Sequence, residues 1–377
     1  MNNSGVSPTV TNCTFINNNG GNGAGMRNID ASPIVTHCTF IDNEGSKGGG
    51  MYNSGGSPTV TDCTFSMTRN GDIGWFGGGM CNINSSVTVT NCTFSDLEVY
   101  RWGAGMYNSG CSPTVTDCTF SGNQVVDCGG GMYNTEASPI VIHCFFSGNS
   151  AGVGGGIGNY DGSSPIVTHC TFSGNHSGCG GGMSNWGDSS PNVSDCIFSE
   201  NKGCGAGIYN IEMSSPTVTN CVFIRNLAHI GFGGGSVNII NSSATVTNCM
   251  FIENMSGYYT TEDDIGGGGV KVMEGSSLTM TNCMFRGNAT TNNGGGINIE
   301  GNSWAMLTNC SFNENSATEL GGGIYIEEST LTIRNSILWG NATQMGNSEI
   351  ENVDADLTIS YCDIRECGGS GAFWDQE

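Results

Sequence analysis

The chain has 377 residues, of which 62 are Gly and only 11% are charged, and its 33 acidic residues far outnumber its 10 basic ones. This balance argues against nucleic acid and anionic membrane surfaces as partners, because both bind clustered Lys and Arg. No run of 18 apolar residues is present, so we expect no membrane insertion by this segment. Regularly spaced Val, Phe, Met and Ile distinguish the chain from disordered Gly-rich sequences, which lack such residues.

One pattern, Ser-Pro-Thr-Val-Thr-Asn-Cys-Thr-Phe, recurs with small changes along the whole chain. Most repeats of its cysteine are 25 or 26 residues apart, and this period predicts a solenoid whose coils contact only their neighbours. The column formed by this position comprises Cys13, Cys38, Cys63, Cys92, Cys118, Cys144, Cys170, Cys196, Cys221, Cys249, Cys283, Cys310, Ser336 and Cys362.

The first predicted strand of each coil is the Thr-x-Thr segment. Val10 lies between Thr9 and Thr11, and alternation of an apolar residue with β-branched residues is typical of a half-buried strand. The following residue, Asn12, begins a column that is Asn, Asp or His in thirteen of fourteen coils, with Tyr361 as the exception. Asn, Asp and His tolerate the left-handed backbone well, so we predict a one-residue bend there.

Two more strands complete the predicted coil. Cys13 and Phe15 point inward from the second strand, and Met26 and Asn28 point inward from a third strand that follows a Gly-rich block. The sequence therefore predicts an all-β, right-handed parallel β-helix of about fourteen coils of about 26 residues, with three short strands per coil. Stacked Asn side chains are expected to hydrogen-bond along the axis.

Two motifs also connect this sequence with a known family. Phe-x-x-Asn, as in Phe15 to Asn18, alternates with Gly-Gly-(small)-(Ile/Met)-x-Asn, as in Gly48 to Asn53. Together they resemble the repeat signature of polymorphic outer-membrane proteins, which are autotransporter adhesins with a β-helical passenger. The resemblance covers nearly every coil and implies the same fold and an adhesive role at the cell surface or outside the cell.

The two ends of the chain differ from the regular coils. Residues 1–5 align with residues 51–55, so the chain begins in mid-coil, and we expect a fragment of a longer secreted protein. End-to-end self-association into a filament is the alternative for this end. We predict regular coils over residues 1–344, and a last degenerate coil with an acidic C-terminal cap over residues 345–377, which hold eight acidic residues.

The cysteine column is expected to contain reduced core thiols. Equivalent Cβ atoms on adjacent coils lie about 4.8 Å apart, more than the roughly 3.5–4.5 Å of a disulfide. Outside the column, Cys179 and Cys204 occupy equivalent positions on adjacent coils, so they form the one pair predicted to be able to form a disulfide.

Insertions fall between the Phe-x-x-Asn and Gly-rich blocks, so they project from one side of the predicted solenoid, which is often the binding side. Several carry aromatic residues, although only 8% of the chain is aromatic. Clustered exposed aromatics indicate an interaction surface, here for a cell-surface protein or glycan. The candidate binding residues are Trp75, Phe76, Tyr100, Arg101, Trp102, Tyr258 and Tyr259.

The outward Thr-x-Thr positions provide an alternative surface. A flat array of regularly spaced Thr resembles the ice-binding face of β-helical antifreeze proteins, although Ile140, Ile142 and Met306 interrupt it, and Thr also favours exposed strand positions. The full pair occurs at Thr9/Thr11, Thr59/Thr61, Thr88/Thr90, Thr114/Thr116, Thr217/Thr219, Thr245/Thr247 and Thr279/Thr281.

A polysaccharide lyase or hydrolase is a further alternative, because such enzymes use this fold and need outward carboxylates. The column that we place outward beside the third-strand Asn includes Arg27, Tyr52, Tyr107, Val237 and Lys271, and it contains no carboxylate. The closest acids on adjacent coils are the turn pairs Glu136/Asp161 and Glu300/Glu327. This distribution argues against an enzyme.

No metal centre or cofactor is predicted. His143 and His169 lie on adjacent coils and Asp263 precedes Asp264, but the two histidines occupy the bend column, where Asn, Asp and His interchange for backbone reasons. Weak Ca²⁺ binding is the one ion interaction that the acidic composition would suit. The preferred function is a non-catalytic extracellular or cell-surface solenoid with a structural or adhesive role.

Overall fold

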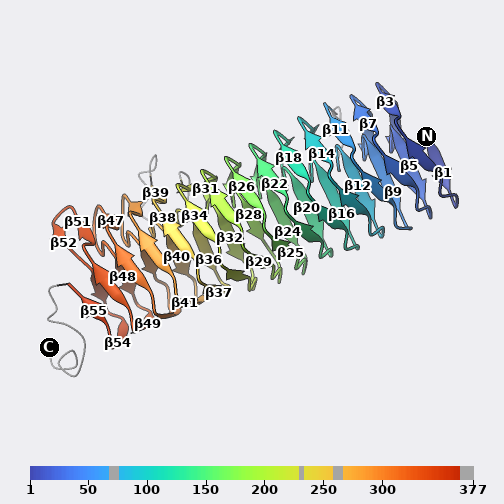
Figure 1. The fold of residues 1–377 in the computed structure, drawn as a ribbon. Helices are drawn as coiled ribbons and strands as arrows, with labels where there is room; N and C mark the ends of the chain where they lie inside the picture. Colours follow the sequence, from blue (N-terminus) through green and yellow to red (C-terminus); the bar gives the residue numbers. More distant parts are fainter. Residues whose placement is uncertain (68–75, 229–232, 258–265, 366–377) are drawn as a thin grey trace. The chain divides into compact units, whose positions relative to one another are not determined.

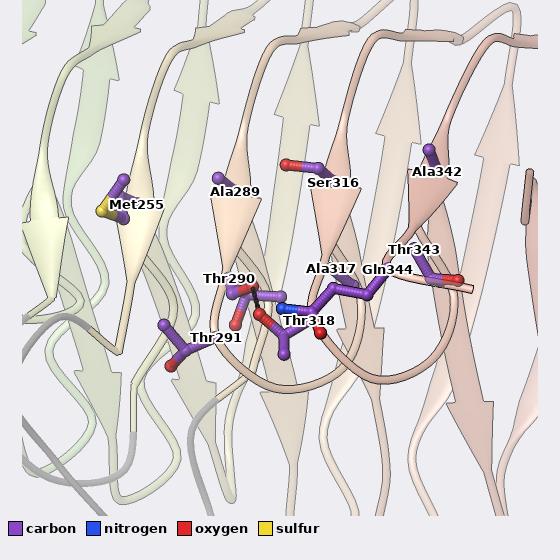
Figure 2. Close-up of a pocket in the computed structure, with 10 residues that line it drawn as sticks. All are labelled: Met255, Ala289, Thr290, Thr291, Ser316, Ala317, Thr318, Ala342, Thr343 and Gln344. Atoms are coloured by element: carbon purple, nitrogen blue, oxygen red, sulfur yellow. Dashed lines mark hydrogen bonds between the residues drawn. The ribbon is translucent and has the colours of Figure 1, made fainter. Parts of the chain in front are cut away.

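The computed structural model describes residues 1–67, 76–228, 233–257 and 266–365, and Figure 1 shows the course of the chain. These residues form short strands, turns and bends, without any helix. The chain divides into two compact units, Met1–Asn192 and Val193–Glu377. Each unit is a parallel β-solenoid in which three long sheets, called A, B and C here, run along the coils and a fourth set of shorter strands, sheet D, completes each coil.

Unit 1 contains the following strands, each paired in parallel with its equivalent one coil away. Sheet A consists of β1 (Asn2–Ser4), β5 (Met26–Ile29), β9 (Met51–Ser54), β12 (Met80–Ile83), β16 (Met106–Ser109), β20 (Met132–Thr135), β24 (Ile157–Tyr160) and β28 (Met183–Asn185). Sheet B consists of β2 (Thr9–Thr11), β6 (Ile34–Thr36), β10 (Thr59–Thr61), β13 (Thr88–Thr90), β17 (Thr114–Thr116), β21 (Ile140–Ile142) and β25 (Ile166–Thr168). Sheet C consists of β3 (Thr14–Ile16), β7 (Thr39–Ile41), β11 (Thr64–Ser66), β14 (Thr93–Ser95), β18 (Thr119–Ser121), β22 (Phe145–Ser147) and β26 (Thr171–Ser173). The shorter strands are β4 (Asn19–Asn22), β8 (Glu44–Lys47), β15 (Glu98–Val99), β19 (Gln124–Val125), β23 (Ser150–Val153) and β27 (His176–Cys179).

Unit 2 repeats this arrangement, and β29 (Asn192–Ser194) lies at the boundary in sequence. Sheet A consists of β32 (Ile208–Ile211), β36 (Val237–Ile240), β40 (Val270–Met273), β44 (Ile297–Ile299), β48 (Ile324–Glu327) and β53 (Ile350–Val353). Sheet B consists of β33 (Thr217–Thr219), β37 (Ser243–Thr247), β41 (Ser277–Thr281), β45 (Trp304–Thr308), β49 (Thr330–Arg334) and β54 (Asp356–Ser360). Sheet C consists of β30 (Ile197–Ser199), β34 (Val222–Ile224), β38 (Met250–Ile252), β42 (Met284–Arg286), β46 (Ser311–Asn313), β50 (Ile337–Trp339) and β55 (Asp363–Ile364). The shorter strands are β31 (Lys202–Cys204), β35 (Leu227–Ala228), β39 (Met255–Ser256), β43 (Ala289–Thr290), β47 (Ser316–Ala317), β51 (Ala342–Thr343) and β52 (Gly346–Asn347). β52 differs from the others because it pairs antiparallel with β51.

The predicted bend between sheets B and C is confirmed. Asn12, His37 and His143 have φ angles of 54°, 53° and 52°, and even Tyr361 adopts φ 56°. The structure adds further left-handed corners after sheets C and A, which the sequence analysis missed. Together with the bend between sheets B and C, these corners hold nine Asp and seven Glu residues with a positive φ, almost half of the chain's 33 acidic residues. A large share of the acidic side chains therefore lies along the edges where the coils turn.

The predicted inward columns are also confirmed. Phe40, Phe65, Phe94 and Phe120 are fully buried and stack with ring centroids 4.7–4.8 Å apart. The Gly-rich block makes room for this stack, because a Cβ at Gly50 would lie only 2.6 Å from Cδ1 of Phe65. In the first coil the equivalent residues are more exposed to solvent, since Phe15 is only half-buried and Cys13 is exposed.

Buried asparagines form hydrogen-bonded ladders inside both units, as predicted. The Asn123 amide donates to Asn149 Oδ1 at 2.9 Å and to the Phe94 carbonyl at 3.0 Å. In unit 2 a carboxylate accepts the last amide of this ladder, since Asn341 donates to Glu349, which also accepts from the Gly340 amide at 2.8 Å. An acceptor-only carboxylate suits this position because every amide in the ladder donates in the same direction.

The cysteine column follows the inward register. The Cys92 thiol donates to the Thr90 carbonyl at 3.2 Å, and the Cys92 amide donates to Cys118 Sγ at 3.4 Å. Burial is the main cause that raises the pKa of the Cys38 thiol. A thiol held neutral in the core behaves as a small apolar side chain that also satisfies a carbonyl.

One register assignment from the sequence is wrong. Val237 pairs with the inward residue Ile208, and Asn238 pairs with the outward residue Tyr209, so the outward position is Asn238 and not Val237. Ser236 occupies the position that is Gly in other coils, and Ile239 replaces the inward Asn. In the predicted C-terminal region, β53–β55 pair in parallel with the preceding coil, and residues 366–377 lie outside the described residues. Glu351 of β53 pairs with the outward residue Tyr325, so the expectation that this outward column contains no carboxylate is wrong.

The Phe stack generates the first prediction. Phe120→Ala should destabilise the protein by about 3–5 kcal/mol, because it removes one ring between two others and the adjacent coils cannot collapse into the gap. Urea unfolding followed by circular dichroism measures this change. The outward neighbour Thr119→Ala is the control and should change stability by about 0.5 kcal/mol or less. A loss below about 1 kcal/mol for Phe120→Ala would contradict the packing described.

Candidate binding surface

The outer face of sheet A in unit 1 is covered by a second layer of side chains. Tyr52, Tyr107 and Tyr133 point outward from the sheet, yet they are only 7–8% exposed. The covering residues belong to the segment before each Gly-rich block, where single parallel bridges connect Lys47 to Phe76, Phe76 to Trp102 and Trp102 to Cys128. Two candidates from the sequence, Phe76 and Trp102, therefore lie side by side over this face.

The aromatic side chains of this layer form a continuous stack, called the aromatic strip below. The Phe76 and Trp102 ring centroids lie 4.9 Å apart, and Trp102 lies 5.7 Å from Tyr133. Tyr133 in turn stacks at 5.1 Å on Tyr160, and Tyr160 stacks at 5.8 Å on Trp186. Stacking occupies the faces of these rings. The strip comprises Phe76, Trp102, Tyr107, Tyr133, Tyr160 and Trp186.

Cations and one exposed tyrosine border the strip. Lys47 Nζ lies 5.3 Å from the Phe76 ring centroid, and the Arg101 guanidinium lies 5.7 Å from the Trp102 ring centroid. Cation–π contacts of this kind hold a charged group against an aromatic surface. Tyr100, next to Arg101, is 55% exposed. The strip thus presents basic groups and an aromatic side chain in a chain with only 10 basic residues.

The covered part of the strip has a low-dielectric environment. Burial raises the pKa of the Tyr107 and Tyr160 phenols and of the Cys128 thiol, because the ionised forms lose hydration there. The Cys128 Sγ lies 3.2 Å from the Tyr160 hydroxyl oxygen, within hydrogen-bond distance. These groups therefore remain protonated and pack as neutral side chains.

Other residues predicted to bind a ligand are not brought into this surface. Trp75, Tyr258 and Tyr259, and the weak metal candidates Asp263 and Asp264, lie outside the described residues. Tyr100, Arg101, Phe76 and Trp102 are the binding candidates whose surroundings the structure describes.

His143 and His169 lie at exposed corners with ring centroids 5.1 Å apart, and His143 Nδ1 is 3.7 Å from Asp117 Oδ1. Within the described ranges no group of three or more His, Cys, Asp or Glu side chains could hold a metal ion. Cys179 is half-buried and Cys204 is buried, in different units, so their disulfide remains a prediction.

The Thr-x-Thr positions form regular arrays on sheet B. In unit 1, Thr59 pairs with Thr88 and Thr88 with Thr114, so three successive coils carry an in-register pair. In unit 2 the same register joins Thr217, Thr245 and Thr279. Ile34, Ile140 and Ile166 interrupt the array in unit 1, where they are 38–49% exposed.

The coils, inward columns and left-handed corners define a right-handed parallel β-helix protein. The chain belongs to the family described as the right handed beta helix region, whose model matches residues 2–146, 125–251 and 235–377. No curated protein matches the sequence. In the parts of the chain that the structure describes, no helix is long and apolar enough to cross a membrane.

Among solved structures, the chain is similar to PfbA, a surface adhesin of Streptococcus pneumoniae. The two share 10% sequence identity, and the match covers 97% of this chain and 86% of that one with a TM-score of 0.37. At this identity and TM-score the likeness carries no argument about function.

The buried tyrosines of the strip predict a loss of stability at alkaline pH. Because burial raises the pKa of Tyr107 and Tyr133, folding favours their neutral form. Unfolded tyrosine ionises near pH 10, so this contribution is fully present below about pH 10 and is lost as pH rises further. Urea midpoints between about pH 9 and 11.5 measure it. The Tyr107→Phe/Tyr133→Phe variant should show a shallower decline, and equal declines would contradict the assignment.

Proposed function

We propose that this chain is a non-catalytic adhesive solenoid, located outside the cell or at the cell surface, and that the aromatic strip of unit 1 is its binding surface. The observation that supports this proposal is the juxtaposition of exposed Tyr100 with Arg101 and the stacked ring of Trp102. Aromatic and arginine side chains are the residues that most often dominate binding energy in interfaces. The partner is a glycan or a protein of a cell surface.

The geometry also favours a rigid platform over an adaptable one. Trp102 stacks on Phe76 and Tyr133, and the layer beneath is almost fully buried. A surface that is already ordered loses little conformational entropy on binding. Because the strip crosses several coils of unit 1, it suits an extended ligand.

The position of the acidic residues supports a non-catalytic role. Glu136 and Asp161 lie at left-handed corners with φ 50° and 52°, and Thr135 donates to Asp161 at 2.8 Å. Backbone geometry thus accounts for Glu136 and Asp161 without invoking acid–base chemistry. A polysaccharide-degradation screen tests the enzymatic alternative. Release of reducing or unsaturated sugars would contradict the non-catalytic proposal.

Substitution at the strip tests adhesion. Tyr100→Ala/Arg101→Ala should weaken attachment of the purified chain to cultured epithelial cells and to a glycan array by about tenfold or more, which corresponds to about 1.4 kcal/mol. The matched control is Arg286→Ala/Trp339→Ala, which removes an arginine and an exposed tryptophan from sheet C of unit 2. Unchanged attachment by a folded Tyr100→Ala/Arg101→Ala variant would contradict the proposal that the partner binds where Tyr100 and Arg101 border the strip.

The in-register threonines support ice binding as a second candidate. Side chains on adjacent strands lie about 4.8 Å apart, so the Thr59, Thr88 and Thr114 rows form a regular grid of hydroxyl and methyl groups. If this face binds ice, the chain should produce thermal hysteresis, and Thr88→Tyr should abolish it by disrupting the flat surface. Thr93→Tyr on sheet C is the control. Absence of hysteresis in the unmodified chain excludes this function.

A further inference from the structure

Lys271 is the one lysine that the described part of the chain buries completely, with 0% exposure. It lies on the outer face of sheet A in unit 2, where it pairs in register with Asn238 on one side and Asn298 on the other. Most other coils place an uncharged residue at this position, and the charged exceptions are Arg27 and Glu351. Burial of an ammonium group is costly unless nearby groups compensate it, so its immediate partners indicate its role.

Glu300 forms an ion pair with Lys271. The Nζ atom lies 2.9 Å from Glu300 Oε1, and the Glu300 side chain is 19% exposed. Glu300 follows Asn298 by two residues, and residues two apart in an extended segment point to the same face. The amine, the carboxylate and the Asn298 amide therefore gather at one place on adjacent coils.

The Asn298 side chain is held in a buried and unsatisfied state. It is 2% exposed, and its Oδ1 atom has no hydrogen-bond partner. Its Nδ2 atom packs so closely on the backbone of Gly266 that any Cβ there would collide with it. Tyr325, on the next coil and 4% exposed, covers the other side of Asn298 in the register of the sheet. A buried amide oxygen without a donor is unfavourable, so hydrogen bonding of Oδ1 is not what holds the Asn298 side chain in this position.

We propose that Lys271 and Asn298 form an intramolecular isopeptide bond, with Glu300 as the group that moves the proton. Glu300 accepts a proton from Nζ of Lys271, and the resulting neutral amine attacks Cγ of Asn298. The new C–N bond forms and the bond between Cγ and Nδ2 breaks. The attacking nitrogen gives its second proton to the departing nitrogen, which leaves as ammonia, and Glu300 ends the reaction as the neutral acid. One amine and one primary amide become one secondary amide and ammonia, so no oxidant or other reactant is required.

The low-dielectric surroundings favour this product. The starting pair is an ammonium and a carboxylate with little hydration, whereas the product is a neutral amide. Proximity in register on adjacent parallel strands converts the reaction into an intramolecular one, which raises its rate by a large factor. The bond would connect β40 to β44, directly after the insertion that precedes Gly266, and thereby fasten two coils of unit 2 covalently.

Intact-mass measurement of the purified, denatured chain tests the proposal. The expected mass is lower than that of the encoded sequence by one ammonia, about 17 Da. Tandem mass spectrometry of a protease digest should find a branched peptide that joins Lys271 to Asn298. An unshifted mass would overturn the proposal, and a branch at Asn238 would overturn the assignment of Asn298.

Three variants separate the chemistry from the fold. Glu300→Gln should leave the mass unshifted, because the amide cannot accept the proton from Nζ, and Asn298→Asp should lose water in place of ammonia. Glu327→Gln, one coil further along the same face, is the matched control and should retain the crosslink. A crosslink that persists in Glu300→Gln would contradict the role of Glu300. This inference does not depend on adhesion, so either proposal can fail alone.

Discussion

In-register pairing of parallel strands is the constraint on which the other features of both units depend. Each residue lies against its equivalent one coil away, as Phe65 lies against Phe40 and Phe94. A favourable side chain therefore stabilises the fold repeatedly, and an unfavourable one is repeated as well. This repetition explains why rings, thiols and amides each occupy their own column. It also explains why the corner positions, which require a left-handed backbone, are rich in Asn, Asp and His.

The columns were predictable from the sequence because pairing repeats them at a fixed period. The layer over sheet A was not, since the position before the Gly-rich block holds Lys47, Phe76, Trp102 and Cys128 in successive coils, and no repeated residue type marks it. Strands of two residues, such as β15 and β19, are also too short to show alternation. The assignment of Val237 failed because four small residues in a row, Gly233 to Ser236, do not reveal which of them faces the Phe stack.

Charge in this protein is a consequence of the corners. The acidic residues with positive φ form rows along the edges of the coils, where Glu200 and Glu314 also pair with Arg225 and Arg286 at 3.2 and 3.3 Å. These ion pairs are exposed and contribute little to stability. The remaining negative charge favours electrostatic repulsion between copies of the chain. The sequence revealed the excess of acid, but its concentration at the corners required the backbone angles.

The outer face of sheet A is where both units create a low-dielectric environment outside the Phe core. In unit 1 this environment contains Tyr107 and Tyr133 beneath Trp102, which makes a rigid apolar surface. In unit 2 it contains Lys271 and Asn298, which makes a reactive polar site. The sequence placed Lys271 in an outward column, where an exposed cation was the natural interpretation. The structure instead buries Lys271 beside Glu300. Covering an outward strand position therefore removes its side chain from water and creates the kind of environment in which we propose a reaction of Lys271.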